Sequence, residues 1–206
     1  MRTTRLGDVC EKIGSGATPR GGSEVYLSSG VSLIRSQNVY NDGFKEDGLA
    51  YINNEHAKEL ENVTVKPDDV LLNITGDSVA RVCQVPEEIL PARVNQHVAI
   101  IRPRKDVLDA RYLRYFLISP EMQQHMLSLA SAGATRQALT KGMIEAFEVP
   151  APPLPEQKAI ASILGSLDDK IELNKKMNET LEAMARAIFK SWFVDFDPIP
   201  GLGPHK

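Results

Sequence analysis

An unbroken heptad pattern runs through the C-terminal part of the chain, and it restricts the possible folds more than any other feature. From residue 160 onward, apolar side chains and two asparagines recur at alternating intervals of four and three residues. This spacing places all of these positions on one stripe of an α-helix. The positions are Ile160, Leu164, Leu167, Ile171, Asn174, Asn178, Leu181, Ala185, Ile188 and Trp192.

A helix over residues 156–193 would be about 57 Å long, because each residue adds about 1.5 Å. One small domain cannot cover a stripe of that length, so the sequence predicts a coiled coil. A surface helix that lies on its own domain is the alternative. Asn174 and Asn178 lie at the middle of the stripe, where polar residues reduce stability but specify register and orientation. We expect an antiparallel homodimer in which Asn174 faces its symmetry mate; two asparagines in a solvated bend are the alternative.

Apolar side chains also flank this stripe. With Leu164 as heptad position a, the flanking e and g positions include four large apolar residues, which are Ile163, Met177, Met184 and Phe189. A two-stranded coil needs only a narrow apolar seam with charged flanks. The wider face predicts a second docking partner, and packing on the protein's own domain or a four-helix self-association is the alternative.

A proline-rich segment separates the helix from a different kind of pattern. Residues 150–155 hold four prolines, which fix the backbone and remove hydrogen-bond donors. The segment before it contains short strands and helices bounded by Gly, Pro, Asn or Asp. Strands are expected at 31–35, 49–52, 70–74, 80–85 and 98–102, and helices at 55–61, 110–118, 120–130 and 141–146.

Strands come first and helices later, which predicts an α+β fold, a small domain with a mixed but mostly antiparallel sheet. The expected organisation is a domain over residues 1–149, a linker over 150–155, a coiled-coil helix over 156–197 and a flexible tail over 198–206.

Charge and composition give weaker indications. The net charge is −3, and residues 1–155 hold 17 Lys and Arg against 19 Asp and Glu, so a non-specific nucleic-acid binder is disfavoured while a sequence-specific reader with a local basic patch is not. Cys10 and Cys83 lie far apart and are expected to be reduced, buried thiols. No apolar run is long enough to cross a membrane, so we expect a cytoplasmic protein.

The sequence shows no catalytic pattern. The turn Gly14–Pro19 lacks the lysine and hydroxyl of a phosphate-binding loop. The four histidines show no i, i+4 pair that would suggest zinc. None of the expected strands is followed by the Asn/Asp-Pro-Pro-aromatic turn that adenine methyltransferases use. These absences predict a binding module with no metal and no cofactor of its own.

Polar turns between the expected strands carry the side chains suited to reading DNA. Arginine pairs with guanine, and asparagine or glutamine with adenine, at the edges of bases in the major groove. In a turn, however, such a side chain often satisfies backbone groups instead, and Gln96 and His97 are expected inside because an apolar strand follows them. The candidate DNA contacts are Arg35, Ser36, Gln37, Asn38, Tyr40, Thr75, Ser78, Arg81, Arg93, Asn95, Thr135, Arg136 and Gln137.

Several segments match the pattern of a known family. They are the opening at 6–8 with 16–19, the strand at 66–72, the turn at 131–140, the run Pro-Pro-Leu-Pro-Glu-Gln within 149–164, and the exit at 191–198. In these segments, which span nearly the whole chain, the sequence resembles the specificity subunits of type I restriction–modification enzymes. The proline-rich run is the most specific part.

The resemblance implies a recognition domain that reads one half of a bipartite double-stranded DNA target. It also implies a helix that sets the spacing of the halves and docks methyltransferase subunits, with a restriction subunit in the full complex. ATP, S-adenosylmethionine and Mg²⁺ then belong to the partner subunits. A full subunit of this family carries two recognition domains and two helices, and this sequence has one of each, so we expect either a natural half-subunit or a truncated form of a longer subunit. Two alternatives stay open, the recognition end of a fused restriction–methylation enzyme and a protein-only coiled-coil adaptor.

Overall fold

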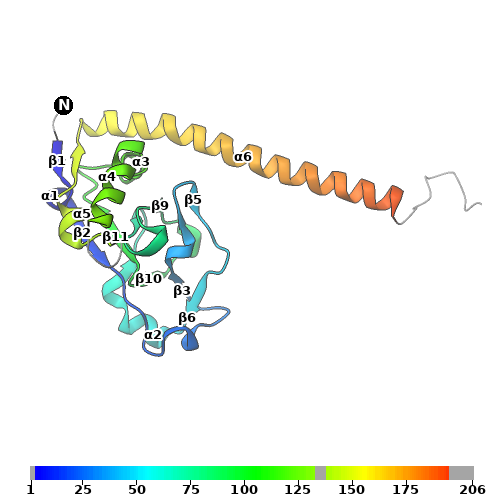
Figure 1. Ribbon diagram of the computed structural model, residues 1–206, viewed down its shortest axis with the longest axis horizontal. Helices are drawn as coiled ribbons and strands as arrows, with labels where there is room; N and C mark the ends of the chain where they lie inside the picture. Colours follow the sequence, from blue (N-terminus) through cyan, green and yellow to red (C-terminus); the bar gives the residue numbers. More distant parts are fainter. Residues whose placement is uncertain (1–2, 133–137, 195–206) are drawn as a thin grey trace, which may run out of the picture. The chain divides into compact units, whose positions relative to one another are not determined.

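The computed structural model describes residues 3–132 and 138–194, and its elements follow one another in the order shown in Figure 1. Its strands are β1 (Thr3–Arg5), β2 (Cys10–Ser15), β3 (Val31–Ile34), β4 (Val39–Tyr40), β5 (Gly43–Phe44), β6 (Ala50–Ile52), β7 (Thr64–Val65), β8 (Val70–Asn73), β9 (Val82–Gln84), β10 (Ala92–Val94), β11 (Val98–Pro103) and β12 (Glu148–Pro150).

The helices begin where the sequence supplies a cap. Asn53, Asp109, Ser119 and Thr140 each accept a hydrogen bond from the backbone N–H three residues ahead, which satisfies a donor at the helix start. The helices are α1 (Leu6–Val9), α2 (Asn54–Glu59), α3 (Ala110–Leu117), α4 (Pro120–Ser131), α5 (Lys141–Glu145) and α6 (Leu154–Phe193), with short 3₁₀ turns at Gly22–Val25, Ser36–Asn38, Glu61–Val63, Gly76–Ser78 and Glu87–Ile89.

The central sheet of the domain, with strand order β2-β11-β8-β9, is buried on both faces. In β8, Val70 and Leu72 enter the first core and Leu71 enters the second. In β11, Ile101 enters the first core and Ile100 enters the second. Successive side chains of a strand point to opposite faces, so two short apolar runs supply two cores. The α+β class expected from the sequence is confirmed.

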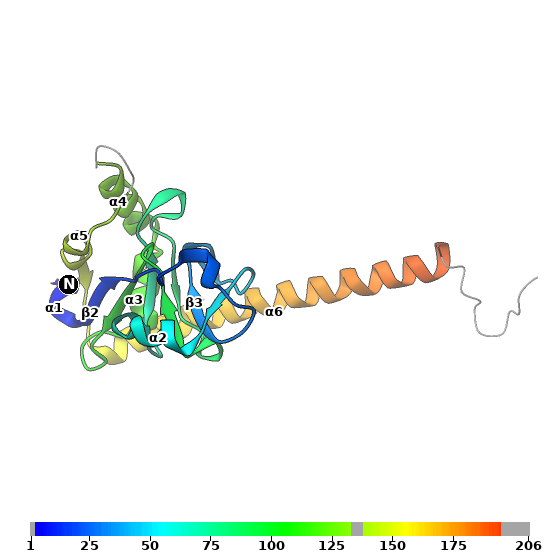
Figure 2. The same ribbon diagram turned by 90° about the horizontal axis from the view of Figure 1, so that it is seen from below.

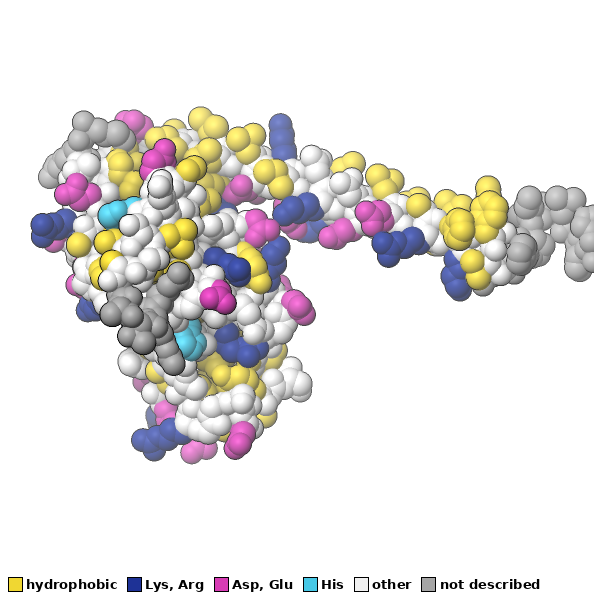
Figure 3. Space-filling model, viewed as in Figure 1, with side chains coloured by type: hydrophobic (Ala, Val, Ile, Leu, Met, Phe, Trp, Pro, Cys, Tyr) yellow, Lys and Arg dark blue, Asp and Glu magenta, His cyan; other side chains and the backbone are white. Residues whose placement is uncertain are grey.

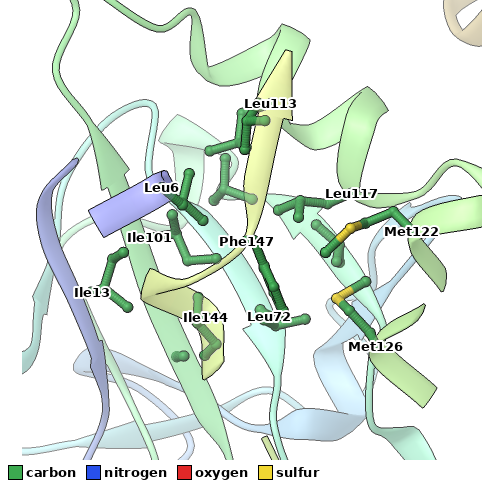
Figure 4. Close-up of a cluster of buried hydrophobic side chains, with 14 of the residues drawn as sticks. Leu6, Ile13, Leu72, Ile101, Leu113, Leu117, Met122, Met126, Ile144 and Phe147 are labelled. Atoms are coloured by element: carbon green, nitrogen blue, oxygen red, sulfur yellow. The ribbon is translucent and has the colours of Figure 1, made fainter. Parts of the chain in front are cut away.

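One core lies between this sheet and helices, and Figure 4 shows Phe147, Met122 and Met126 around Leu72 there. The other core lies between the same sheet and a second sheet of order β6-β3-β10-β7, with α2 packed against it. Figure 2 shows α4 and α5 on the side of β2, with α2 beside β3. Among the described residues, the parallel β3–β10 pair is the exception to antiparallel pairing.

The predicted strands and helices of the domain are all present, with ends that differ by one or two residues. Some strands that sequence patterns missed are very short, as is β10 with three residues, and others contain glycine, as does β2. Their partners are distant in sequence: β10 pairs with β3, and β2 pairs with β11. Such strands are stabilised by pairing with segments that are distant in sequence, so local sequence patterns do not predict them.

The chain divides into two compact units, Met1–Ala161 and Ser162–Lys206, so the first turns of α6 belong to the domain. The sequence placed this boundary earlier, at 150–155. Gln157 is fully buried; its side chain accepts a hydrogen bond from the Asp109 N–H at 2.9 Å and donates to the carbonyls of Val107 and Pro152 at 3.0 and 2.8 Å. The last residue of the proline-rich run thus anchors the start of α6.

The two cysteines lie in different surroundings, Cys83 buried and Cys10 partly buried. Burial raises the pKa of each thiol to about 12 from the ordinary value of 9.0. We expect neither thiol of the folded protein to react with a thiol reagent at pH 8, and both to react in urea, because the thiolate is the nucleophile. Since the folded state holds these protons more tightly, this contribution to stability is complete below pH 9 and is lost as the pH rises toward 12. Rapid labelling of Cys83 in the folded protein would contradict the expectation.

Candidate nucleic-acid interface

Two parallel strands end side by side at one edge of the domain. Because β3 and β10 run parallel, the residues that follow them, Arg35 and Asn95, come together there. The Asn95 N–H donates to the Ile34 carbonyl at 3.0 Å. Two turns that lie about sixty residues apart in the sequence therefore share one edge.

The central sheet ends at the same edge. The Gly16 N–H donates to the Val98 carbonyl at 2.9 Å and the Ala17 N–H to the Val94 carbonyl at 3.1 Å, so the exit of β2 joins the two sheets. A Cβ on Gly16 would lie 1.9 Å from the Val94 carbonyl oxygen, which only glycine permits. The exit of β8 lies there as well, because the Ile74 N–H donates to the His97 carbonyl at 3.0 Å.

We call this edge the turn cluster and define it as residues 15–18, 35–41, 75–81 and 95–97. A bridge between Thr75 and Ala138 also brings the end of the turn after α4 to it. Within that turn, Thr135, Arg136 and Gln137 were candidate DNA contacts, and they lie outside the described residues. The remaining candidates can be placed one by one.

Three candidates use their polar groups inside the domain instead of presenting them to a base. Asn38 is fully buried; its side chain accepts from the Arg35 N–H at 3.0 Å and donates to the Lys45 and Asp47 carbonyls. Asn95 is buried and accepts from the backbone N–H of His97 at 3.1 Å. The structure thus corrects the expectation for both asparagines: they hold turns.

Arg93 is the third candidate whose polar groups are used inside the domain. Its guanidinium donates to the carbonyls of Ala57 and Ala92, both at 3.0 Å. Burial lowers the pKa of Arg93, an effect that Glu61 opposes. These bonds use Nε and Nη1 of Arg93 within the domain, between α2 and the second sheet, which disfavours the prediction that Arg93 contacts a base.

Arg35, Ser36 and Gln37 have partly structural roles. Arg35 and Gln37 both donate to the Gly48 carbonyl, and the Arg35 guanidinium lies over the Tyr26 ring at 5.3 Å. Ser36 is half-buried, and its carbonyl accepts from the Asn73 side chain at 2.8 Å. Of the three, Gln37 is the exposed one.

A chain of hydrogen bonds crosses the turn cluster and contains residues that the sequence analysis did not select. The Thr18 hydroxyl donates to the side-chain oxygen Oε1 of Gln96, and Gln96 Nε2 lies 3.0 Å from His97 Nε2. His97 Nδ1 lies 2.6 Å from Thr75 Oγ1. With Gln96 as donor, the His97 proton lies on Nδ1. Gln96 is exposed and His97 half-buried, so the expectation that both are internal is wrong.

Tyr40 and Arg81 meet at the same edge. The Arg81 guanidinium carbon lies over the Tyr40 ring at 4.5 Å from its centroid, and Lys45 Nζ lies 5.9 Å from the same centroid. Ser78, half-buried, accepts a hydrogen bond from the Arg81 N–H through its carbonyl at 3.2 Å. The structure thus brings three candidates from two separate turns together.

The face of the domain seen in Figure 3 carries basic and acidic side chains interspersed. Around the turn cluster, Arg35 and Arg81 are accompanied by the acidic Asp47 and Asp77. A mixed surface of this kind fits selective hydrogen bonding better than bulk attraction to phosphates.

In residues 3–132 and 138–194, no group of three or more His, Cys, Asp or Glu side chains is placed to hold a metal ion. Within that same portion of the chain, no helix has both the length and the apolar character to cross a membrane.

The helix α6 presents a second candidate surface. From Ile171 to Phe193 its large apolar side chains are more than half exposed, and Figure 3 shows most of the hydrophobic atoms along one side of the helix. Ile163 and Leu167, earlier in the helix, are also more than half exposed. The predicted interface residues within the exposed range are Ile171, Met177, Leu181, Met184, Ile188, Phe189 and Trp192. Two positions of the heptad stripe are less exposed. Leu164 is half-buried, and Ile160 packs against the core of the domain.

Comparison with known proteins gives consistent results. A family model described as "Type I restriction modification DNA specificity domain" matches residues 1–183. The chain is 33% identical over 170 residues to the type I restriction enzyme HindI specificity subunit of Haemophilus influenzae, covering 82% of this chain and 37% of that protein.

Two solved structures resemble the fold. The type I restriction–modification S subunit from M. genitalium matches with a TM-score of 0.65 at 14% identity, over 95% of this chain and 46% of that one. A structure concerning complex assembly and conformational transition of the type I R-M system matches with a TM-score of 0.63 at 22% identity, over 92% and 44%. The chain thus spans less than half the length of these relatives.

Proposed function

Because the chain belongs to the family of type I restriction–modification DNA specificity domains, we propose that it is a DNA-recognition module that reads one half of a bipartite target. The observation that carries the proposal is the turn cluster, where the ends of four strands bring polar side chains from distant turns to one edge of a rigid domain. Loops on a rigid scaffold suit base-specific contacts. We propose that the module catalyses nothing itself and works in the cytoplasm.

The second part of the proposal concerns α6. Its heptad stripe would pair with a second copy of the chain in antiparallel orientation. Its flanking residues Ile163, Met177, Met184 and Phe189 would dock methyltransferase subunits. The support is exposure, because burying such side chains is worth about 1.5–3 kcal/mol each. A restriction subunit would join the full complex, and ATP, S-adenosylmethionine and Mg²⁺ would be bound by the partners.

Selection of bound duplexes from a random pool, with the chain alone and together with a methyltransferase subunit, tests the DNA proposal. We expect a consensus of two half-sites separated by unread bases, a palindrome if the chain is a homodimer. Half-sites on one face of the duplex lie about 34 Å apart per helical turn, a separation that a helix about 60 Å long can support. Purified chain should show no nuclease, ATPase or methyltransferase activity.

The two alternatives predict different results. A protein-only coiled-coil adaptor would select no consensus under either condition. The recognition end of a fused restriction–methylation enzyme would select one, but the native reading frame would continue into a catalytic domain.

A further inference from the structure

Tyr40 and Arg81 form a cation–π pair, in which the guanidinium lies over the tyrosine ring. The guanidinium carbon lies 4.5 Å from the ring centroid, and no described residue accepts a hydrogen bond from this guanidinium or forms an ion pair with it. Stacking occupies the flat face of a guanidinium and leaves its N–H groups free at the edge. Among the described residues, the N–H donors of Arg81 are therefore not used by another protein group.

We propose that Tyr40 and Arg81 act as one element that reads a guanine in the target, an inference that rests on the proposed function. A guanidinium edge matches the O6 and N7 acceptors of guanine in the major groove and pairs with both. Arg35 and Arg93 are less suited to this contact with guanine. The Arg35 guanidinium donates to the Gly48 carbonyl, and that of Arg93 donates to the carbonyls of Ala57 and Ala92.

One hydrogen bond holds the two segments of the pair together. Asn41 directly follows Tyr40 and Val82 directly follows Arg81, and the Val82 N–H donates to Asn41 Oδ1 at 2.8 Å. The bond fixes the distance between the two backbones next to the stack. Ala80, on the other side of Arg81, has a φ of +70°, an unusual conformation for alanine that needs support from its surroundings.

Gln123 of α4 supplies that support. Its Oε1 accepts from Asn41 Nδ2 at 3.1 Å, and its Nε2 donates to the carbonyls of Ala80 and Leu117, both at 2.8 Å. A single amide thus binds the residue after Tyr40, the residue before Arg81 and the end of α3. Gln123 is a positioning residue: it touches no DNA and fixes the stacked pair that does.

The first test compares wild type and Arg81→Lys by selection from a random duplex pool. Lysine keeps the charge and can still donate to guanine, but it lacks the rigid planar fork that pairs with O6 and N7 together. We expect one G·C position of the wild-type consensus to relax by roughly 5- to 150-fold, with affinity for unrelated DNA unchanged. Replacing that guanine by 7-deazaguanine, which lacks the N7 acceptor, should weaken wild type on the order of tenfold and weaken Arg81→Lys less, because lysine lacks the rigid paired geometry.

The second test uses Gln123→Met, which keeps the size of the side chain but cannot make its three hydrogen bonds. We expect it to relax the same G·C position, and the double variant with Arg81→Lys to be no worse than Arg81→Lys alone, because residues that act through one contact are not additive. Gln124→Met is the matched control, since Gln124 is exposed on the same helix; its consensus should match that of wild type.

Distinct outcomes overturn distinct claims. An unchanged consensus in Arg81→Lys, or equal sensitivity of both proteins to 7-deazaguanine, overturns the guanine assignment while leaving DNA recognition intact. If Gln123→Met is folded, as judged by its melting curve, but loses specificity equally at all positions of the consensus, the positioning role of Gln123 is overturned. Failure of wild type to select any consensus overturns the proposed function itself and this inference with it.

Discussion

Replacing Asp69 by alanine is expected to lower the free energy of unfolding of the domain by about 3–5 kcal/mol, because it leaves a largely buried arginine without its partner. Asp69 is fully buried, and its two oxygens accept from Arg102 Nε and NH2, both at 2.7 Å. The carboxylate also accepts from the Lys66 N–H at 2.7 Å. Urea unfolding of the full chain at fixed concentration measures the loss.

The neighbouring ion pair supplies the control. Lys105 lies 2.7 Å from Asp68, but both side chains are largely exposed, and exposed pairs contribute little because water and salt screen them. Lys105→Ala should therefore leave the unfolding midpoint nearly unchanged. Equal effects of Lys105→Ala and Asp69→Ala would show that burial does not decide the strength of these pairs.

Glutamate at both Ile171 and Leu181 is expected to raise the dissociation constant of the helix pair by at least about 100-fold, since each buried apolar side chain is worth about 1.5–3 kcal/mol. Both residues lie on the proposed seam and are exposed in the single chain. Sedimentation equilibrium over a range of concentrations measures the change. Glutamate at Lys176 and Ala183, both exposed and on the opposite side of the heptad, is the matched control and should leave the pair intact.

Substitution of the residues that flank the heptad stripe distinguishes self-association from docking of a methyltransferase subunit. Glutamate at both Met177 and Met184 is expected to leave the dimer and its DNA binding intact but to prevent assembly with a methyltransferase subunit. Loss of the dimer in this variant would place both methionines in the self-interface and contradict the docking proposal. A wild-type chain that stays monomeric at high concentration, or pairs in parallel, would contradict the antiparallel arrangement.

The sequence alone determined the features that depend on local periodicity. The apolar runs of β8 and β11 predict strands, and the capping residues Asp109 and Ser119 mark the helices that follow. The heptad spacing predicts α6, which begins at Leu154, two residues before the expected start. Local patterns suffice here because backbone geometry within a few residues sets these elements.

Only the tertiary structure decided which polar side chains remain available for recognition. Asn38 and Gln96 are both amides in turns that follow apolar strands, yet Asn38 is fully buried and fully bonded while Gln96 is exposed. Arg93 and Arg81 are both half-buried, but the Arg93 guanidinium donates to two carbonyls, whereas no described residue accepts from that of Arg81. The difference depends on carbonyls that pairing with distant segments brings within reach, such as that of Ala57 for Arg93, and local sequence does not record such contacts.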